Sequence, residues 1–577
     1  MGMMSGGELV AEFLLKHEIP QLFTLCGGHI SPILVASKAR GIRVIDTRHE
    51  ADAVFAADAT ARLTSKIGVA AVTAGPGITN SMTALQNALM AQSPLLLIGG
   101  AAPTLLKGRG ALQDIDQISL MRPNVKWAGA IKKRKDIIPQ LTRAFEKAMD
   151  GTPGPVFLEM PVDVLYPEEL VRSWYVQAKT KGKSITQKVT NWYIHRHVNR
   201  MFSGRDDHIK IISQTQPSIQ TFQIPKLQKL ISRSKQPILV VGSGAITQPG
   251  RVTELAKAVE SLGIPTFLSG MARGLLGASH LLHIHHKRKA ALKSADLILL
   301  CGVPCDFRLD YGNHLGHGTY VGINRDRTDL YKNRKPDLAI LSDPHAMLCE
   351  LANDKSSEVP DWSDWKNKLH ENEEVREKEI QAQAQTTSNA GINPLQLFKL
   401  LDRELTDKSV IIADGGDFVG TAAYTLTPRK PLSWLDPGVF GTLGVGGGFA
   451  LGSKSVHPDS EVFIIYGDGS SAYSLMEMDA FMRHKMPVIA IIGNDASWNQ
   501  IARDQVEILK DACGTELAHS DYELVAKAFG AAGSRVETLQ EFSKALNEAK
   551  KANASGQSYV INAILAPSEF RKGSMSM

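Results

Sequence analysis

Short apolar runs alternate along the chain with longer stretches in which apolar residues recur every three or four positions. A short apolar run is the pattern of a buried strand, and the three-to-four spacing is the pattern of a helix with one buried face. In the first part of the chain, strand-like runs lie at 21–25, 42–45, 69–73, 95–98 and 156–159. Strands that alternate with helices in this way are typical of a parallel sheet covered by helices on both faces.

The same alternation returns twice later in the chain. Strand-like runs lie at 238–241, 297–300, 320–323, 410–413, 462–465 and 488–492. A chain of 577 residues is also too long for one hydrophobic core. We therefore expect an α/β protein with three doubly wound parallel-sheet domains, at residues 1–170, 226–352 and 391–577. Residues 171–225 are expected to form a basic amphipathic linker, and residues 353–390 a polar helical connector.

The composition is ordinary for a globular protein, with 43% hydrophobic and 21% charged residues. The five cysteines are an odd number without metal-ligand spacing, which favours a reducing compartment over a disulfide framework. Cys301 and Cys305 have no second pair to complete a zinc site, so we expect them to be buried structural thiols. No apolar run approaches the ~18 residues that span a bilayer, and the first residues lack the pattern of a signal peptide or a myristoylation site. The sequence therefore predicts a chain without a membrane-spanning helix.

Positive charge is concentrated in the linker. The net charge is +6, and residues 172–205 contain eight Lys or Arg and no Asp or Glu, so the rest of the chain sums to −2. In the same segment, apolar residues recur at helical intervals at Ile185, Val189, Trp192, Tyr193, Ile194, Val198, Met201 and Phe202. A basic amphipathic helix can lie on an anionic membrane surface or cover an acyl-chain groove, and it can equally pack on the protein itself. No nucleic-acid-binding module surrounds the cluster, so nucleic acid is not an expected partner.

Candidate chemistry in the third domain lies where two strand-like runs end. Gly467-Asp468-Gly469 follows one run, and Asn494 follows the next, 26 positions after Asp468. Parallel strands bring both groups to the carboxyl edge of the sheet, where open α/β sheets bind ligands. A carboxylate, an amide oxygen and a nearby backbone carbonyl suit Mg²⁺ holding a diphosphate, and the Ser470 hydroxyl is a further anion contact. Gly-Asp-Gly alone is also ordinary turn chemistry.

Two stretches in the first domain carry candidate chemistry. Glu50 ends an Arg-His-Glu triplet after one strand-like run, and a Gly-Pro-Gly turn at Gly75 and Pro76, followed by Asn80, comes after the next. A glutamate at a helix start commonly does no more than stabilise the helix dipole. Glycines in a strand-to-helix turn allow a ligand to approach the backbone, yet alone such a turn is a loop. The combination of both with the later motif is the informative feature.

Together, Arg-His-Glu, a Gly-Pro-Gly turn beginning 25 residues after the glutamate, and Gly-Asp-Gly followed by Asn494 resemble the thiamine diphosphate-dependent enzymes of the acetohydroxyacid synthase and 2-hydroxyacyl-CoA lyase group. The resemblance implies a pyrimidine-binding first domain, a central domain, and a diphosphate- and Mg²⁺-binding third domain. It implies that Glu50 is catalytic, because the family glutamate bonds the aminopyrimidine and favours the tautomer that takes the C2 proton. Gly493 departs from the family pattern, which has an asparagine pair here.

The resemblance also implies the remaining site residues. The stretch GALQDIDQ is similar to the family's G-A-x-Q-x-x-D-Q, which makes Gln113 a candidate catalytic contact to the substrate, with a solvated helix start as the alternative. Leu443 is the candidate for the bulky side chain that bends the cofactor, and the magnesium ligands are expected to be Asp468, Asn494 and the carbonyl of Ala496. Cofactor contacts are expected at Glu50, Gly75, Pro76, Asn80, Gly416, Asp417, Gly441, Thr442, Leu443, Gly467, Asp468, Gly469, Ser470, Asn494 and Trp498.

By the same resemblance we expect a lyase that cleaves a 2-hydroxyacyl-CoA to formyl-CoA and an aldehyde one carbon shorter, as in fatty acid alpha-oxidation, with the cofactor as electron sink. The alternatives are an acetolactate synthase that condenses two pyruvates and a non-catalytic scaffold. In the family the central domain holds ADP, FAD or no nucleotide, and the segments around Arg273 and Arg325 are candidate phosphate contacts.

The resemblance has two implications for where and in what form the protein acts. In the family the two halves of the cofactor site meet across subunits, so we expect a homodimer or homotetramer. It also implies association with the endoplasmic reticulum membrane. The sequence as written is that of a soluble protein, which leaves the cytosol as the alternative location.

Overall fold

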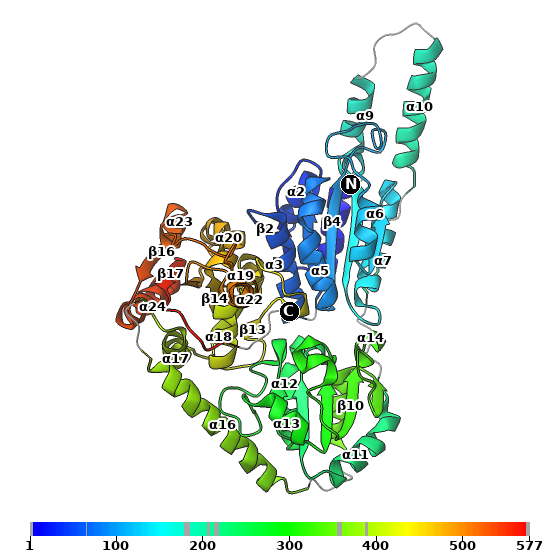
Figure 1. Cartoon of the computed structure of the whole chain (residues 1–577). Helices are drawn as coiled ribbons and strands as arrows, with labels where there is room; N and C mark the ends of the chain where they lie inside the picture. The colour runs from blue at the N-terminus through cyan, green and yellow to red at the C-terminus, as the bar shows by residue number, and fades with distance from the viewer. Residues whose placement is uncertain are drawn as a thin grey trace. The chain divides into compact units, whose positions relative to one another are not determined.

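The computed structural model describes residues 4–64, 66–177, 185–204, 208–212, 219–354, 360–386 and 390–572 (Figure 1). The chain divides into two compact units. The first contains Met1–Arg62 and Lys66–Thr215, and the second contains Leu63–Ser65 and Gln216–Met577. The first unit holds one sheet and the second holds two, and all neighbouring strands in the three sheets are parallel. The predicted fold class is therefore confirmed.

The sheet of the first unit has the strand order β2-β1-β3-β4-β6-β5. Its strands are β1 (Gln21–Thr24), β2 (Arg43–Asp46), β3 (Gly68–Val72), β4 (Leu95–Ala101), β5 (Trp127–Ala130) and β6 (Pro155–Pro161). The helices are α1 (Gly6–Lys16), α2 (Ser31–Ala39), α3 (Glu50–Leu63), α4 (Pro76–Asn80), α5 (Met82–Met90), α6 (Gln117–Met121), α7 (Ile137–Met149), α8 (Val162–Leu165), α9 (Glu168–Gln177) and α10 (Ile185–Met201). The apolar side of α1 packs with α2 and α7, and its Phe13 contacts Phe145 edge-on.

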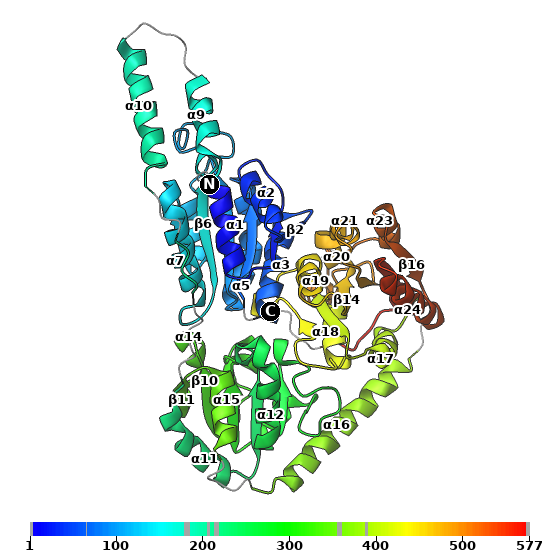
Figure 2. The same ribbon diagram turned by 180° about the vertical axis from the view of Figure 1, so that it is seen from behind.

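The basic linker forms the helices α9 and α10. Both extend beyond the end of the first unit's sheet, as the two opposite views show (Figures 1 and 2). The helical spacing of apolar residues from Ile185 onward thus predicts the local structure correctly.

The central sheet, in the second unit, has the order β11-β10-β9-β7-β8. Its strands are β7 (Pro237–Val241), β8 (Thr266–Leu268), β9 (Leu297–Cys301), β10 (Thr319–Asn324) and β11 (Leu338–Leu341). The helices around it are α11 (Ile224–Arg233), α12 (Val252–Leu262), α13 (Arg288–Ser294), α14 (Arg327–Leu330) and α15 (Pro344–Asn353). The polar connector follows as the helix α16 (Ser363–Ala384), in agreement with its predicted helical character.

The last sheet has the order β13-β12-β14-β15-β17-β16. Its strands are β12 (Ser409–Asp414), β13 (Trp434–Leu435), β14 (Glu461–Gly467), β15 (Ile489–Asn494), β16 (Ala532–Val536) and β17 (Tyr559–Ile564). Its helices are α17 (Pro394–Glu404), α18 (Asp417–Thr425), α19 (Val445–Val456), α20 (Asp468–Ser474), α21 (Met478–Arg483), α22 (Asn499–Leu509), α23 (Tyr522–Ala528) and α24 (Leu539–Ala554). Between β14 and β15 the chain forms α20, a turn of 3-10 helix at Leu475–Glu477, and α21.

Some strands escape the apolar pattern. These are β5, β8, β11, β13, β16 and β17. Strand β5, with the sequence WAGA, is only half-buried at the sheet edge, so it has no continuous apolar run to reveal it. Strands β8 and β13 have three and two residues, which is too short for a period to show. In β17, the buried Asn562 interrupts the apolar run.

Two further expectations concern cysteines and membrane spans. Cys301 and Cys305 are completely buried, as expected for structural thiols, and burial raises the pKa of both. Among the residues that the structure describes, no helix combines the length and the apolar character needed to cross a bilayer.

Candidate active site

Glu50 and the Gly-Pro-Gly turn lie side by side at the carboxyl edge of the first sheet. Glu50 is the first residue of α3, just after β2, and its side chain is 6% exposed. Its Oε2 accepts a hydrogen bond of 3.0 Å from Nδ2 of Asn80, the last residue of α4. A Cβ at Gly77 would lie 3.5 Å from Glu50 Oε1, so the turn runs directly beside the carboxyl group. The structure thus brings together the two candidate stretches of the first domain.

Gly75 cannot be replaced without strain, for two independent reasons. Its φ of +60° is a conformation that residues with a Cβ rarely adopt. A Cβ there would also lie 2.7 Å from the backbone carbonyl oxygen of Gln113. Pro76 follows at the first position of α4, where its fixed φ suits the helix start. The turn is therefore shaped by its own residues and by the loop around Gln113.

A buried glutamine that the sequence does not single out fixes this turn. Gln117, at the start of α6, accepts a hydrogen bond of 2.9 Å from the Gly75 N–H through Oε1. Its Nε2 donates to the Gly100 carbonyl at 3.1 Å and to Glu159 Oε2 at 3.0 Å. Glu159 is 1% exposed and is also paired with Lys107. The second glutamine of GALQDIDQ is the only sequence signal for this bridge.

His29 is a second residue that sequence reasoning does not assign. It follows β1, and its Nδ1 lies 3.0 Å from Thr73 Oγ1. The same Thr73 hydroxyl donates to Gln113 Oε1 at 3.5 Å, so Gln113 belongs to a polar group with His29 and is not a solvated helix start. Burial lowers the pKa of His29, which favours the neutral imidazole. The candidate substrate contact Gln113 is therefore part of a linked group with Thr73 and His29.

The candidate metal ligands lie at the ends of adjacent strands in the second unit. Strands β14 and β15 are parallel neighbours with Gly467 opposite Gly493, so Asp468 and Asn494 follow side by side. The Asp468 carboxylate is 2% exposed and accepts hydrogen bonds from the backbone N–H groups of Gly469, at 2.7 Å, and Ser497, at 3.2 Å. Burial raises its pKa.

Asn494 and Ala496 provide the other two candidate oxygens. Asn494 is completely buried, and its Nδ2 donates to Asn562 Oδ1 at 3.0 Å, which leaves Oδ1 as its ligand atom, 3.1 Å from His519 Nδ1. Ala496 has a φ of +53°, an uncommon conformation for a residue with a Cβ, and its carbonyl accepts from the Leu517 N–H at 2.7 Å. This local backbone turn sets the direction of the Ala496 carbonyl.

The donor set suits a hard divalent cation. Burial, with the nearby Asp468, raises the pKa of Asp495 to about 6. A divalent cation between or beside these two carboxyl groups would stabilise both as carboxylates. All the candidate ligands are oxygens, which is the set that Mg²⁺ prefers.

Gly493, the departure from the family motif, has a local steric cause. A Cβ at Gly493 would lie 2.5 Å from the ring of Phe418, a buried residue of α18. No side chain fits at this position while the phenyl ring stays in place. The side chain of the candidate metal ligand Asn494 is bonded to Asn562 and His519 instead, so the departure leaves the candidate ligand set intact.

Trp498 packs on the first turn of α20. A Cβ at Gly469 would lie 2.4 Å from its indole ring, so the glycine lets the indole cover this turn. The Ser470 hydroxyl donates to the carbonyls of Asp414, at 2.6 Å, and Gly467, at 3.1 Å. Ser470 therefore holds the backbone of the site, and its predicted cofactor contact stays a prediction.

A buried carboxyl group holds the glycine-rich loop. Asp414 is completely buried and accepts hydrogen bonds from the N–H groups of Gly444, at 3.0 Å, and Gly446, at 2.7 Å. Burial raises its pKa to about 7. These bonds fix the backbone immediately after Leu443, whose side chain is half-buried.

The remaining loop candidates lie beside this carboxyl group in sequence or space. Gly441 has a φ of +64°, and the Thr442 hydroxyl donates to the Leu443 carbonyl at 3.0 Å. Asp417 is ion-paired with Arg503, and a Cβ at Gly416 would meet the side chain of Gln500. The cofactor roles of these residues stay predictions.

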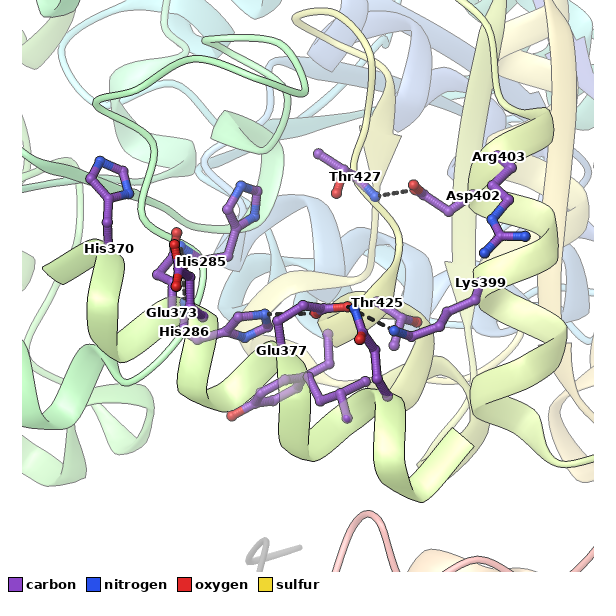
Figure 3. Close-up of a pocket in the computed structure, with 14 residues that line it drawn as sticks. His285, His286, His370, Glu373, Glu377, Lys399, Asp402, Arg403, Thr425 and Thr427 are labelled. Carbon is purple, nitrogen blue, oxygen red and sulfur yellow. Dashed lines mark hydrogen bonds and ion pairs between the residues drawn. The ribbon is translucent and has the colours of Figure 1, made fainter. Parts of the chain in front are cut away.

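A cavity lies elsewhere in the second unit. It has a volume of about 590 Å³. Figure 3 shows its lining, which consists of His285, His286, His370, Glu373, Glu374, Glu377, Ile380, Gln381, Lys399, Asp402, Arg403, Tyr424, Thr425 and Thr427. None of the predicted cofactor residues is among them. The cavity is therefore distinct from the candidate active site.

Polar pairs across this cavity join the connector helix to its surroundings. Glu377 on α16 bonds Lys399 on α17 at 2.7 Å, and Glu373 accepts from the His286 N–H at 2.8 Å (Figure 3). Next to the cavity, burial lowers the pKa of His283 to about 3 and also lowers that of His285. Glu373 and Glu377 are thus bonded to groups on neighbouring elements, as expected for a structural contact between helices.

Arg273, one of the candidate phosphate contacts of the central domain, is engaged by other residues of the second unit. Arg273 Nη1 donates to the Ala423 carbonyl at 2.7 Å, and its guanidinium lies 5.1 Å from the Trp434 ring centroid. These contacts join the two sheets of the second unit. A phosphate contact at Arg273 or Arg325 stays a prediction.

Comparison with known proteins agrees with this arrangement. Residues 4–120 match the model of the thiamine pyrophosphate enzyme N-terminal TPP binding domain, residues 224–351 the central domain, and residues 414–563 the C-terminal TPP binding domain. The chain belongs to the thiamine pyrophosphate enzyme family.

Individual relatives within this family differ in how similar they are to the chain. The chain is 48% identical to "2-hydroxyacyl-CoA lyase 2" of Caenorhabditis elegans, over 99% of this chain and 91% of that protein. It is 46% identical to "2-hydroxyacyl-CoA lyase 2" of Homo sapiens, over 99% and 92%. It is 30% identical to "Acetolactate synthase large subunit IlvG" of Mycobacterium tuberculosis, over 98% and 96%. The relatives named as lyases therefore align with nearly the whole chain, at a higher identity than the acetolactate synthase.

Proposed function

We propose that this protein is a thiamine diphosphate-dependent carbon–carbon lyase that cleaves a 2-hydroxyacyl-CoA into formyl-CoA and an aldehyde one carbon shorter. The observation that carries the reaction class is the buried Glu50 carboxyl group, bonded to Asn80 beside the Gly75–Gly77 turn. The substrate class is supported by relatives named 2-hydroxyacyl-CoA lyase 2 that align with nearly the whole chain.

The residues of the first unit manage protons and orientation. When bound, thiamine diphosphate supplies a carbanion at C2 and an electron sink for the bond that breaks. Glu50 would hold a proton for the pyrimidine ring at its carboxyl group, which the Asn80 amide keeps in place by donating to Oε2. Gln113 and His29, linked through Thr73, are placed to bond polar groups of the substrate. Gln117 keeps the Gly75 turn in position.

The residues of the second unit hold the charged end of the cofactor. We assign Mg²⁺ to Asp468 Oδ, Asn494 Oδ1 and the Ala496 carbonyl, since these oxygens lie at the ends of adjacent strands or in the following turn. Leu443 and Trp498 are assigned as apolar contacts to the cofactor. Because the pyrimidine and diphosphate residues belong to different compact units, a homodimer or homotetramer in which they meet across subunits is part of the proposal. ADP or FAD in the central domain is a further part of the proposal, without a specific supporting contact.

The test is a direct assay of both candidate reactions. The purified protein, with thiamine diphosphate and Mg²⁺, is incubated with a long-chain 2-hydroxyacyl-CoA or with pyruvate, and mass spectrometry follows the aldehyde and acetolactate. We expect the aldehyde, its loss in Glu50→Gln, and full activity in Glu371→Gln, which changes an exposed glutamate on α16. Acetolactate alone would contradict the lyase and favour a pyruvate-condensing enzyme, whereas failure to bind thiamine diphosphate would favour a scaffold.

The oligomeric state and the nucleotide of the central domain are tested in separate experiments. Native mass spectrometry should show a dimer or tetramer, and a strictly monomeric active enzyme would contradict shared sites. Release of bound ligands by denaturation, followed by mass spectrometry, should give ADP or FAD, and flavin absorbance in the preparation would identify FAD.

A further inference from the structure

Helix α10 has two apolar faces. Ile194, Val198 and Met201 lie on one face, and the last two are 2% exposed because they pack into the core of the first unit. Successive residues of a helix are turned by about 100°, so these three side chains share one stripe. This face accounts for the position of the helix on its own domain.

The other apolar face has no protein partner among the described residues. Ile185 is 81% exposed, Val189 and Trp192 are each 59% exposed, and Tyr193 is 51% exposed. By helical geometry their centre lies roughly 180° from the packed stripe. We call these four residues the outward face of α10. Solvated helix faces are normally polar, so this contiguous apolar surface indicates a binding surface.

All the charged side chains of α10 itself are positive. Lys188 and Arg196 lie on or next to it and are exposed, and the Arg196 guanidinium lies 5.2 Å from the Trp192 ring centroid. The helix contains no Asp or Glu, as is true of the whole segment 172–205. An apolar stripe with indole and guanidinium groups at its border matches the boundary between lipid headgroups and acyl chains.

The helix is held firmly on its domain. His197, on the packed side, lies with Nε2 2.7 Å from Thr104 Oγ1. The same hydroxyl donates to Asp163 Oδ2 at 2.6 Å, and Tyr175 of α9 donates to that oxygen at 2.7 Å. Asp163 is completely buried. The outward face is therefore presented by a fixed helix, so binding does not first require the helix to fold.

The positive charge of α10 distinguishes between the candidate binding partners of its outward face. A second copy of the face would bring two wholly cationic segments together, which is unfavourable. Nucleic acid supplies the negative charge but no acyl region to receive Ile185 and Val189. An anionic lipid surface satisfies both the charge and the apolar side chains. We propose that the outward face of α10 docks this protein on an anionic lipid surface.

The experiment measures sedimentation of the full chain with phosphatidylcholine vesicles, with and without phosphatidylserine. The wild type should bind the vesicles that contain phosphatidylserine, more weakly at high salt. Val189→Asp, Trp192→Asp and Lys188→Glu should each weaken binding by about tenfold or more, since each removes an apolar or cationic contact. The matched controls are Val35→Asp and Lys38→Glu, which change exposed residues of α2 and should bind as the wild type does.

The outcomes separate this proposal from its alternatives. Circular dichroism checks that all variants fold. Absence of wild-type binding to phosphatidylserine vesicles, or equal binding by the α10 variants and the controls, overturns the proposal. Sedimentation velocity in which Val189→Asp alone dissociates the assembly assigns the face to a second copy and also overturns it. No substrate is needed, so the result is independent of the lyase assay.

Discussion

Replacing Gln117 by methionine should loosen the Gly75 turn with little change in volume. The substitution removes three buried hydrogen bonds, to the Gly75 N–H, the Gly100 carbonyl and the Glu159 carboxylate. Two neutral bonds at about 1 kcal/mol each and one to a charged group at about 1.5–3 kcal/mol give a loss of roughly 3–5 kcal/mol. The loss falls on the first unit, where Gln117 is 2% exposed.

Hydrogen–deuterium exchange measures directly the loss of the hydrogen bond from the Gly75 N–H. Since each 1.4 kcal/mol is about a factor of ten, exchange in the peptide that contains Gly75 should be more than about a hundredfold faster. Affinity for thiamine diphosphate, measured by calorimetry, should fall as well, because the turn lies beside Glu50. Gln140→Met, at a half-buried position of α7, is the matched control. Exchange and affinity equal to those of the control would refute the bridging role of Gln117.

Two further results are expected. Gly75→Ala should lower the free energy of unfolding by about 2–4 kcal/mol through backbone strain and overpacking. Gly41→Ala, at a φ of +83° with open space around it, should show only the cost of the strain. Equal losses for the two variants in urea unfolding would contradict the contact between Gly75 and Gln113. Because burial depresses the pKa of His283 to about 3, below the unfolded value of ~6.5, its contribution to stability is complete above pH ~6.5 and declines toward pH ~3, by up to about 1.4 kcal/mol per pH unit. His283→Gln should flatten the fall of the urea midpoint between neutral and mildly acidic pH, and an unchanged slope would contradict it.

The parts of the site that the sequence predicts are those fixed by strand ends. Asp468 and Asn494 follow apolar runs, and parallel pairing of β14 with β15 then places them together whatever the rest of the fold does. Glu50 is predictable for the same reason, since it follows β2. The parallel sheets are equally predictable from the sequence, because their central strands are continuous apolar runs.

The parts that escape prediction depend on contacts between distant positions. Gln117 acts on Gly75, 42 residues earlier, and Asp414 acts on Gly444, 30 residues later, so neither role has a local pattern. His29 is linked to Gln113 only through Thr73, on a different strand end. Short or half-buried edge strands such as β5 are missed because their burial comes from neighbours and not from their own residues.

The packing of Phe418 against Gly493 constrains the order in which this motif can change during evolution. Asparagine introduced at 493 in one step would place its Cβ 2.5 Å from the phenyl ring. A smaller residue at 418 must come first, and alone it leaves a cavity in the core next to β12 and β15. The two positions are therefore epistatic, and the intermediate is less stable than either end. A chain that keeps this phenyl ring therefore also keeps glycine at 493, and the adjacent candidate ligand Asn494 is unaffected.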